Sequence, residues 1–460
     1  GTFKTSKDMI DAMTKAMNSM AYYIVMAFFC ALFIDAFSKS NIGALMAIEG
    51  AEMLKAAALP SWLTIIGIGE DGLEGLKPEA RQALSQAELI IGGERHLSML
   101  PADDNRPTMT WPSPLMILVE DVLKRRGEKI VILATGDPMH YGIGVTFAKR
   151  LPSDEMTVFP TLSAFTLAAS RLKWDLSRTV CLTLHGRPNE LLLPHLQDGA
   201  RLFALSDNGE TPTEVAALLT QQGFGKSRLT VLEHMDGPEE KHLSSTAADW
   251  GPDRCKDLNT IAIDCIADQP GNGMPLITGL PDQAFAHDGQ LTKQEIRAVT
   301  LSALSHSPGT LLWDVGAGSG SVGIEWMRQS PLSQTYAIEH HPERIGYIKK
   351  NRSALGVPGL KLVEGKAPDA LSKLPVPDAI FIGGGLTTAG VFEACWQALK
   401  PGGVLVANTV TIEGEAKTLA LFQEFGGTLK RLDYARAEQT GKFTTWKPFR
   451  QITQLRVVKE

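Results

Sequence analysis

The chain has 460 residues, and at about 150 residues per domain this length predicts two to four domains. Hydrophobic residues make up 44% of the sequence and charged residues 21%, so each domain can bury a core. The net charge of −6 argues against a nucleic-acid partner. The five cysteines include no CxxC pair, which argues against a disulfide framework or a zinc site. We therefore expect a cytoplasmic protein without a bound metal.

Residues 1–59 differ in composition from the rest of the chain. Residues 21–34 form an unbroken apolar run, shorter than the roughly 20 residues that span a bilayer. The run predicts either a buried or interfacial helix or a piece of a membrane protein. Residues 20–55, MAYYIVMAFFCALFIDAFSKSNIGALMAIEGAEMLK, resemble a membrane segment of the p-aminobenzoyl-glutamate transporter family. We interpret 1–59 as a transporter remnant joined to an unrelated gene or as a gene-calling artefact, with any membrane contact made through residues 16–37.

From Leu63 onward, short apolar runs alternate with amphipathic stretches, which predicts an α/β domain with a mostly parallel sheet over residues 60–267. A helix is expected at 78–88. The predicted strands are 63–69, 88–93, 129–138, 156–160, 179–186, 200–207 and 258–267. The Pro- and Gly-rich residues 268–278 predict a linker.

A second α/β domain is expected over residues 279–460. Its apolar runs predict strands separated by helices. These predicted strands are 310–316, 334–339, 360–365, 378–384 and 402–410.

The sequence LLWDVGAGSGSVGIEWM, residues 311–327, reads as a strand, a glycine-rich turn and a helix. Glycines let a ligand approach the backbone, and a helix N-terminus presents free N–H groups. The GxGxxG spacing from Gly318 to Gly323 also occurs in dinucleotide-binding proteins, so the spacing alone is weak. An acidic residue before the turn, Glu339 at the end of the next strand, and LKPGGVLV at 399–406 favour an S-adenosylmethionine site.

Together these features resemble class I methyltransferases, whose fold is Rossmann-like. The resemblance implies a cofactor site in which Gly365 and Ala367 lie beside adenine. Simple loop chemistry would also explain these two residues, and a strand-end or capping role would explain Asp314. The expected cofactor-binding residues of this domain are Asp314, Gly316, Gly318, Gly320, Glu339, Gly365 and Ala367.

The first α/β domain has a different glycine motif. IIGIGEDGLEGL at 65–76 also fits GxGxxG, but the helix that follows begins too late for a Rossmann unit. ATGDPMHYGIG at 134–144, with PTLSAFTLAASRLKWDL at 160–176, LHGRP at 184–188 and VLEHMDGPEEKHLSSTAADW at 231–250, resembles the tetrapyrrole methylase family. That family binds S-adenosylmethionine between two α/β subdomains.

This second resemblance implies its own set of cofactor-binding residues: Gly67, Gly69, Gly136, Asp137, Ser163 and His185. Each polar member has a structural alternative. Asp137 could form an Asx turn before Pro138, Ser163 could cap a helix, and His185 could be a hydrogen-bonded histidine at a strand end.

The succession of these two domains resembles the bifunctional, decarboxylating precorrin-6Y methyltransferase family, as does GLPDQAFAHDGQLTKQEIRAVTLSAL at 279–304. The resemblance implies methylation of a precorrin at carbons 5 and 15, loss of the carbon 12 acetate carboxyl group, and a place in cobalamin biosynthesis. It implies two S-adenosylmethionine molecules per chain. It assigns no catalytic residue, and we expect a homo-oligomer. The alternative is a membrane-tethered protein that binds the cofactor without catalysis.

A precorrin carries many carboxylates, so its site should contain cations. Lys293 and Arg297 are four residues apart on a predicted helix and would share a face. Arg171 and Arg187 are parallel candidates in the first domain. The alternative for Lys293 and Arg297 is a solvated basic face.

Overall fold

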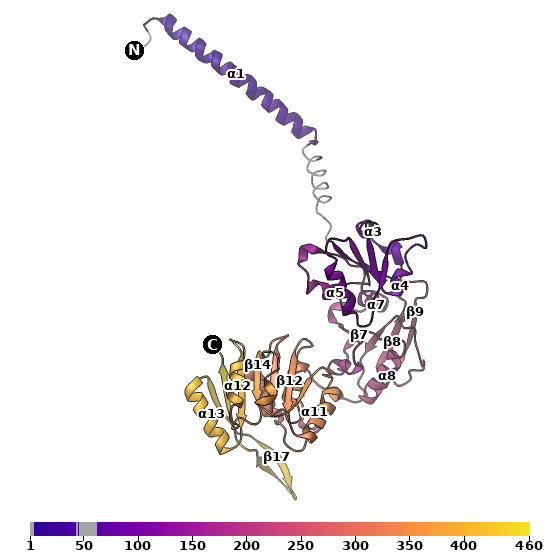
Figure 1. The fold of residues 1–460 in the computed structure, drawn as a ribbon, viewed down its shortest axis with the longest axis vertical. Coiled ribbons are helices and arrows are strands. Elements are labelled where there is room, and N and C mark those ends of the chain that lie inside the picture. The colour runs from indigo at the N-terminus through magenta and orange to yellow at the C-terminus, as the bar shows by residue number, and fades with distance from the viewer. Residues whose placement is uncertain (1–3, 43–44, 46–61) are drawn as a thin grey trace. The chain divides into compact units, whose positions relative to one another are not determined.

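The computed structural model describes residues 4–42, 45 and 62–460. The chain divides into two compact units (Figure 1). Unit 1 comprises Gly1–Gly67, Leu76–Ala134 and Gly142–Pro160, and unit 2 comprises Ile68–Gly75, Thr135–Tyr141 and Thr161–Glu460.

Helix α1, Ser6–Lys39, contains the apolar run of the N-terminal segment. It begins at a capping box in which Thr5 and Asp8 each bind the other's backbone N–H, and it continues beyond the run at both ends. None of its residues is buried, so it is not a core helix of the described chain. Its 34 residues are long and apolar enough to cross a membrane, by length and composition alone.

Unit 1 contains a five-stranded sheet in the order β3-β2-β4-β1-β5. The pairings of β1 with β5 and of β2 with β3 and β4 are parallel. All six residues of β1 are buried, as expected for a strand covered on both faces. The strands are β1 Leu63–Ile68, β2 Leu89–Gly92, β3 Thr108–Thr110, β4 Ile130–Thr135 and β5 Met156–Phe159, and the helices are α3 Pro78–Ser85, α4 Glu94–Leu97, α5 Met116–Lys124 and α6 Ile143–Ala148.

The first sheet of unit 2 has the order β6-β7-β10-β8-β9. Only β6 and β7 pair in parallel, so a mostly parallel arrangement is wrong for this sheet. The apolar run of β10 suggested a parallel strand because β10 is buried on both faces. Ile261 and Ile263 pack in one hydrophobic cluster and Ala262 in another. The elements are β6 Val180–Thr183, β7 Arg201–Leu205, β8 Arg228–Glu233, β9 Lys241–Thr246 and β10 Asn259–Asp264, with helices α7 Ala164–Leu172 and α8 Thr211–Gln221.

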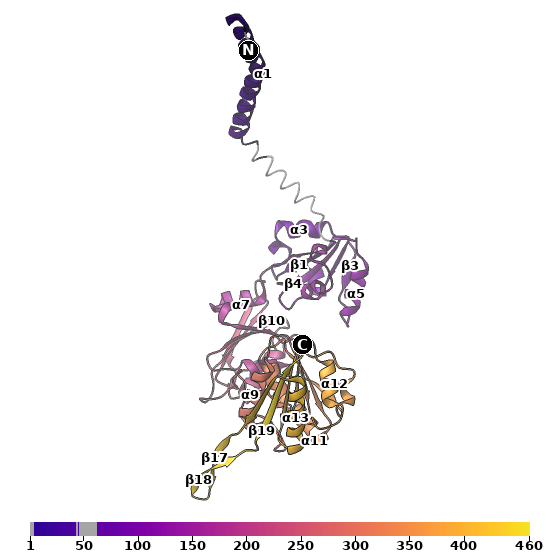
Figure 2. The same ribbon diagram turned by 90° about the vertical axis from the view of Figure 1, so that its left-hand side faces the viewer.

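The second sheet of unit 2 has seven strands in the order β13-β12-β11-β14-β15-β19-β16. The five strands predicted from the sequence pair in parallel, and β19 runs antiparallel between β15 and β16. Strands β17 and β18 form a separate hairpin that extends beyond the sheet (Figure 2). The strands are β11 Leu311–Val315, β12 Gln334–Glu339, β13 Lys361–Glu364, β14 Ala379–Ile382, β15 Val404–Thr409, β16 Thr428–Leu432, β17 Ala435–Thr440, β18 Phe443–Pro448 and β19 Ile452–Val458.

Helices cover both faces of this sheet. Trp313 and Ile380 pack in one cluster with residues of α12 Val391–Ala398 and α13 Ile412–Phe425. Leu312 and Phe381 pack in another with residues of α9 Gln294–Leu304 and α10 Ser321–Arg328, and α11 Pro342–Ala354 follows β12. The strand order reverses between β11 and β14, and open α/β sheets bind ligands outside the carboxyl ends of their strands at such a point.

The segment 268–278 forms hydrogen bonds with residues before and after it in the chain. The Met274 carbonyl accepts hydrogen bonds from Gln197 at 2.8 Å and from Arg328 at 3.0 Å. The Asn272 amide donates to the Gly223 carbonyl at 2.7 Å. This irregular segment therefore has fixed contacts with the chain before and after it.

Candidate active site

The glycine turn after β11 requires glycine for two different reasons. Gly316 and Gly318 both have positive φ, +70° and +60°. A Cβ on Gly316 would lie 2.9 Å from the backbone nitrogen of Gly384, so any side chain there collides with the loop after β14. A Cβ on Gly318 would meet only the Gln290 carbonyl oxygen at 3.6 Å. The backbone at Gly318 is thus open to a neighbouring ligand.

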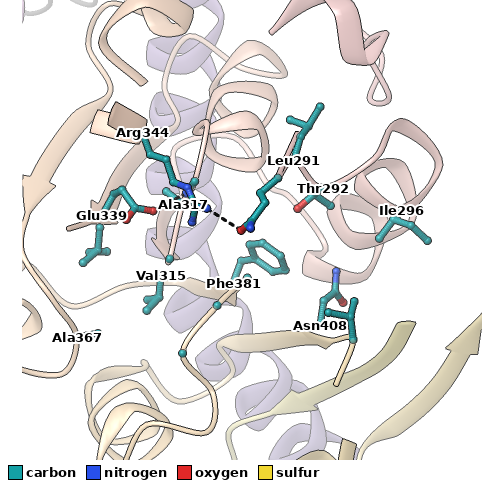
Figure 3. Close-up of a pocket in the computed structure, with 18 of the residues that line it drawn as sticks. Leu291, Thr292, Ile296, Val315, Ala317, Glu339, Arg344, Ala367, Phe381 and Asn408 are labelled. Carbon is teal, nitrogen blue, oxygen red and sulfur yellow. Dashed lines mark hydrogen bonds between the residues drawn. The ribbon is translucent and has the colours of Figure 1, made fainter. Parts of the chain in front are cut away.

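A cavity of about 840 Å³ lies at the carboxyl ends of these strands, within the usual size range of small-molecule sites. It is lined at one end by the glycine turn, Glu339 and Ala367, and at the other by Ile296 and Asn408 (Figure 3). The structure brings five of the predicted cofactor-binding residues together in its wall: Gly316, Gly318, Glu339, Gly365 and Ala367.

Glu339 is held rigidly at the end of β12. Its carboxylate is 3% exposed and accepts backbone N–H bonds from Gly318 at 2.9 Å, His340 at 2.8 Å and His341 at 2.9 Å. These bonds fix the carboxylate at the cavity wall, where it can accept from the two hydroxyls of a ribose. With small or apolar residues beside it, this end fits the adenosyl part of S-adenosylmethionine.

Asp314 is absent from the lining of the cavity, and its role in cofactor binding stays a prediction. The carboxyl group is 1% exposed, and its Oδ2 accepts the Gly323 N–H at 3.0 Å. Its Oδ1 is buried without a hydrogen-bond partner among the described residues. Burial raises the pKa of Asp314 to about 7, and the charge of Glu339 also raises it. Asp314 therefore joins β11 to α10 from behind the glycine turn.

Gly320 also lies outside the cavity lining. It is the N-cap residue of α10, with φ +77°, and a Cβ there would lie 3.2 Å from the Ile348 side chain. Its contribution to the site is the close approach of α10 to α11, which a side chain would prevent.

The two predicted substrate-binding cations of this domain have different environments. Lys293 lines the cavity, and its ammonium group lies 3.5 Å from the Gly289 carbonyl. Arg297 is fully buried, with Nε 2.5 Å from Glu325 and Nη1 3.5 Å from Asp282. The expectation that Arg297 binds substrate is therefore wrong, because its guanidinium group is enclosed by acidic partners in the core.

Lys293 and Arg297 have different environments because of how α9 begins. Lys293 is the N-cap residue and has extended backbone angles, so the helical spacing that would place it on one face with Arg297 does not apply. The helix turns Arg297 toward α10, while Lys293 remains at the cavity.

Further residues of the cavity were not identified from the sequence. The cations are Arg344, Lys366 and Arg450, and the other groups include Asn408, Tyr434 and Phe449. Arg344 forms an ion pair with Asp288 at 3.0 Å and donates to the Gln290 side chain at 2.7 Å. The aromatic and cationic residues of KPFR at 447–450 were a possible signal, but the strands around them were not predicted.

In the tetrapyrrole methylase-like region, residues 68–75 and 135–141 belong to unit 2, although they follow strands of unit 1. Gly136 has φ +59°, and a Cβ there would lie 3.2 Å from the Leu162 carbonyl and 3.4 Å from the Ser163 Cα. The loop carrying Asp137 thus lies directly against the start of α7. Of the remaining glycines, Gly69 follows β1 within unit 2 and Gly67 lies inside β1.

Two polar residues of this region, Asp137 and Ser163, have the structural roles named as alternatives. Asp137 accepts the Met139 N–H at 2.8 Å in an Asx turn, and Ser163 caps α7 by accepting the Thr166 N–H at 3.2 Å. The His185 side chain is 75% exposed, with Nδ1 3.4 Å from Asp207.

Arg171 already pairs with two acidic side chains, and its role in substrate binding stays a prediction. Its guanidinium group donates to both oxygens of Glu240, at 2.7 and 2.9 Å, and lies 3.4 Å from Asp236. Arg187 lines a second, smaller cavity of about 540 Å³, and its guanidinium carbon lies 5.8 Å from the Tyr141 ring centre.

Three families match successive parts of the chain. The family described as "AbgT putative transporter family" matches residues 1–69, "Tetrapyrrole (Corrin/Porphyrin) Methylases" matches 62–250, and "Precorrin methyltransferase domain" matches 283–459. These matches agree with the resemblances inferred from the motifs.

Three relatives bear on the assignment. "Precorrin-6Y C(5,15)-methyltransferase [decarboxylating]" of Sinorhizobium sp is 48% identical over 398 residues, covering 86% of this chain and 96% of that protein. "Probable cobalt-precorrin-6B C(15)-methyltransferase (decarboxylating)" of Pyrobaculum calidifontis is 35% identical over 178 residues, covering 36% of this chain and 88% of that protein. "Cobalt-precorrin-7 C(5)-methyltransferase" of Salmonella typhimurium is 27% identical over 179 residues, covering 39% of this chain and 88% of that protein. The identity to the Sinorhizobium protein and the coverage of its length show that this chain belongs to the precorrin-6Y C(5,15)-methyltransferase (decarboxylating) family.

Proposed function

We propose that this chain is an S-adenosylmethionine-dependent enzyme of cobalamin biosynthesis that methylates a precorrin at carbons 5 and 15 and removes the carboxyl group of the carbon 12 acetate. The observation that carries the proposal is the 48% identity to the Sinorhizobium protein named "Precorrin-6Y C(5,15)-methyltransferase [decarboxylating]", of which this chain covers 96%. The alternative of a tethered binding protein without catalysis is not favoured, because the named relatives of this length are enzymes.

The C-terminal cavity supplies the binding groups that such a reaction needs. Glu339 would hold the ribose, Gly318 would let the methionine part pass the backbone, and Ala367 would leave room for adenine. Bound S-adenosylmethionine supplies an electrophilic methyl group. The protein's task is then to align the macrocycle carbon and to exclude water, because meso carbons conjugated to ring nitrogens are already nucleophilic.

Decarboxylation makes a different demand on the site. The C–C bond to the carboxyl group breaks, its electron pair enters the conjugated macrocycle, carbon dioxide leaves, and the remaining carbon takes a proton. A cation beside the departing carboxylate would stabilise the starting state more than the transition state and would slow this step. We therefore expect the cations of the cavity to bind carboxylates that stay on the macrocycle.

We propose a division of labour between two cofactor sites in each chain. The tetrapyrrole methylase region would methylate carbon 5, and the C-terminal domain would methylate carbon 15 and decarboxylate. Two separate relatives support the division, because one is named for C(5)-methylation and the other for C(15)-methylation with decarboxylation. Each covers a stretch of this chain about as long as one of the two family matches.

Two matched substitutions test the division. Gly318→Arg would fill the open space beside the C-terminal glycine turn, and the product should gain one methyl group and keep its acetate carboxyl group. Gly136→Arg, beside Asp137, should block methylation at carbon 5 and leave decarboxylation intact. Normal carbon dioxide release by the Gly318→Arg variant would move decarboxylation to the other region. Calorimetry with S-adenosylhomocysteine should count two sites in the wild type and one in each variant.

We also propose that the domains are residues 60–267 and 279–460, and that the N-terminal 59 residues take no part in the reaction. The relative from Sinorhizobium is covered almost completely although 14% of this chain lies outside the match. The enzyme would act in the cytoplasm as a homo-oligomer, with any membrane contact made through residues 16–37.

A further inference from the structure

Hairpin β17–β18 has a polar and aromatic base beside the C-terminal cavity. Tyr434 precedes β17 and Phe449 follows β18, so the hairpin pairing places these two residues opposite each other, with Arg450 next to Phe449 in the chain. The Phe449 N–H donates to the Tyr434 carbonyl at 3.0 Å, and the two rings stack with centres 4.4 Å apart. Tyr434, Phe449 and Arg450 all line the cavity.

The base of the hairpin is fixed in place by ion pairs. Arg436 pairs with Glu295 of α9 at 2.6 Å and with Asp282 at 3.0 Å, and its guanidinium group lies over the Phe449 ring. Asp282 also accepts the Gln294 N–H at the start of α9. The stacked ring pair is therefore held against the same helix whose N-cap residue, Lys293, lines the cavity.

Two polar groups at this position have no hydrogen-bond or ion-pair partner in the part of the chain that the structure describes. The Tyr434 hydroxyl is buried with no hydrogen-bond partner among the described residues. Burial raises the pKa of Tyr434 to about 12, and the charge of Glu295 raises it in the same direction. The hydroxyl is therefore a neutral donor at physiological pH. Within residues 62–460, no hydrogen bond or ion pair engages the Arg450 side chain. A hydroxyl donor and a guanidinium group beside one cavity suit an anionic ligand with several acceptor oxygens.

We infer that Tyr434 and Arg450 form a carboxylate-binding subsite that holds a carboxylate side chain of the macrocycle in the C-terminal domain. The inference rests on the proposed function for the identity of the ligand. The carboxylate held here is one that remains on the product, because an ion pair to the departing carboxylate would oppose its conversion to neutral carbon dioxide. The stacked rings of Tyr434 and Phe449 form an apolar wall next to this subsite.

The test uses the full chain with purified precorrin-6Y and S-adenosylmethionine, and it measures carbon 15 methylation and carbon dioxide release separately from carbon 5 methylation. Arg450→Gln and Tyr434→Phe should each raise the KM for the two C-terminal reactions, by roughly 10- to 100-fold for the charged group and roughly tenfold for the hydroxyl. The kcat should change little, and carbon 5 methylation should keep its wild-type KM. Arg450→Lys should recover part of the loss.

Two controls match the substitutions. Lys447→Gln removes an exposed cation of the same hairpin that pairs with Glu438, and Tyr347→Phe removes an exposed hydroxyl that donates to Glu343. Both should leave KM unchanged, and every variant should bind S-adenosylhomocysteine with wild-type affinity.

The outcomes separate this inference from the proposed function. A wild-type chain that neither methylates precorrin-6Y nor releases carbon dioxide would overturn the proposed function. An active wild type with KM unchanged, within twofold, in both Arg450→Gln and Tyr434→Phe would overturn the subsite alone. A fall in kcat at constant KM would also overturn it, because the residues would then act on the reacting atoms.

Discussion

The buried carboxyl group of Asp314 leads to a test that separates a structural role from a cofactor-binding role. Asp314→Asn keeps an oxygen that can accept the Gly323 N–H and removes the ionisable group. Because the side chain lies outside the cavity lining, the variant should bind S-adenosylhomocysteine at the C-terminal site with affinity close to that of the wild type. It should also change how local stability depends on pH.

The magnitude follows from the raised pKa. Asp314 has a pKa of about 7 in the folded chain against an ordinary value of 3.8. Below pH 3.8 the group is protonated in both states, and between these values the unfolded state loses its proton while the folded state keeps it. Stability therefore falls as pH rises through this window, by about 1.4 kcal/mol per unit and about 4 kcal/mol in all, and levels off above pH 7.

Hydrogen exchange read by mass spectrometry can measure the local unfolding free energy of peptides from β11 and α10. Between pH 5 and pH 7 the wild type should lose about 2 kcal/mol relative to Asp314→Asn, and comparing the two proteins cancels the other titrating groups. Parallel pH dependence in the two proteins would refute the idea that this carboxyl group stays protonated when folded. Loss of S-adenosylhomocysteine binding in a folded variant would return Asp314 to the cofactor site.

Gly316→Ala should weaken S-adenosylhomocysteine binding at the C-terminal site at least tenfold in calorimetry, because its Cβ meets the Gly384 backbone. The control is Gly402→Ala, because Gly402 shares the positive φ but has open space around it. Equal binding in both variants would contradict the steric argument. Arg297→Met should cost about 3–5 kcal/mol of stability because it leaves the buried carboxylate of Glu325 without its cation, while Asp282 keeps its ion pair with Arg436. KM for precorrin-6Y should be unchanged in the folded protein, and a raised KM without a fall in Tm would indicate a substrate role for Arg297. Deleting residues 1–59 should leave all three reactions intact and improve solubility, and loss of activity in a folded, truncated chain would contradict this.

The sequence predicted the strands that are buried on both faces, because such strands are continuous apolar runs. Strands β1 and β11 are of this kind, and both lie where they were expected. The direction of β10 was not predictable in the same way, since burial on both faces makes an antiparallel strand as apolar as a parallel one. Strands β17 and β18 were missed because nearly all of their residues are exposed, so no apolar pattern marks them.

At the site, the sequence indicated the residues whose role depends on local backbone geometry. The turn at Gly316 and the carboxylate of Glu339 at the next strand end follow from a strand-turn-helix motif, and both line the cavity. Residues that depend on tertiary placement were not predictable. Arg297 lies on a predicted helix and is enclosed by acidic side chains, whereas Arg450 lies outside every predicted element and lines the cavity.

On the proposed function, one chain methylates a precorrin twice and decarboxylates it. The most direct test is mass spectrometry of the product that the purified full chain forms from precorrin-6Y and methyl-labelled S-adenosylmethionine. The product should carry two labelled methyl groups and should have lost one carboxyl group. A product without label, or one that carries two labelled methyl groups and all of its carboxyl groups, would contradict the proposed function.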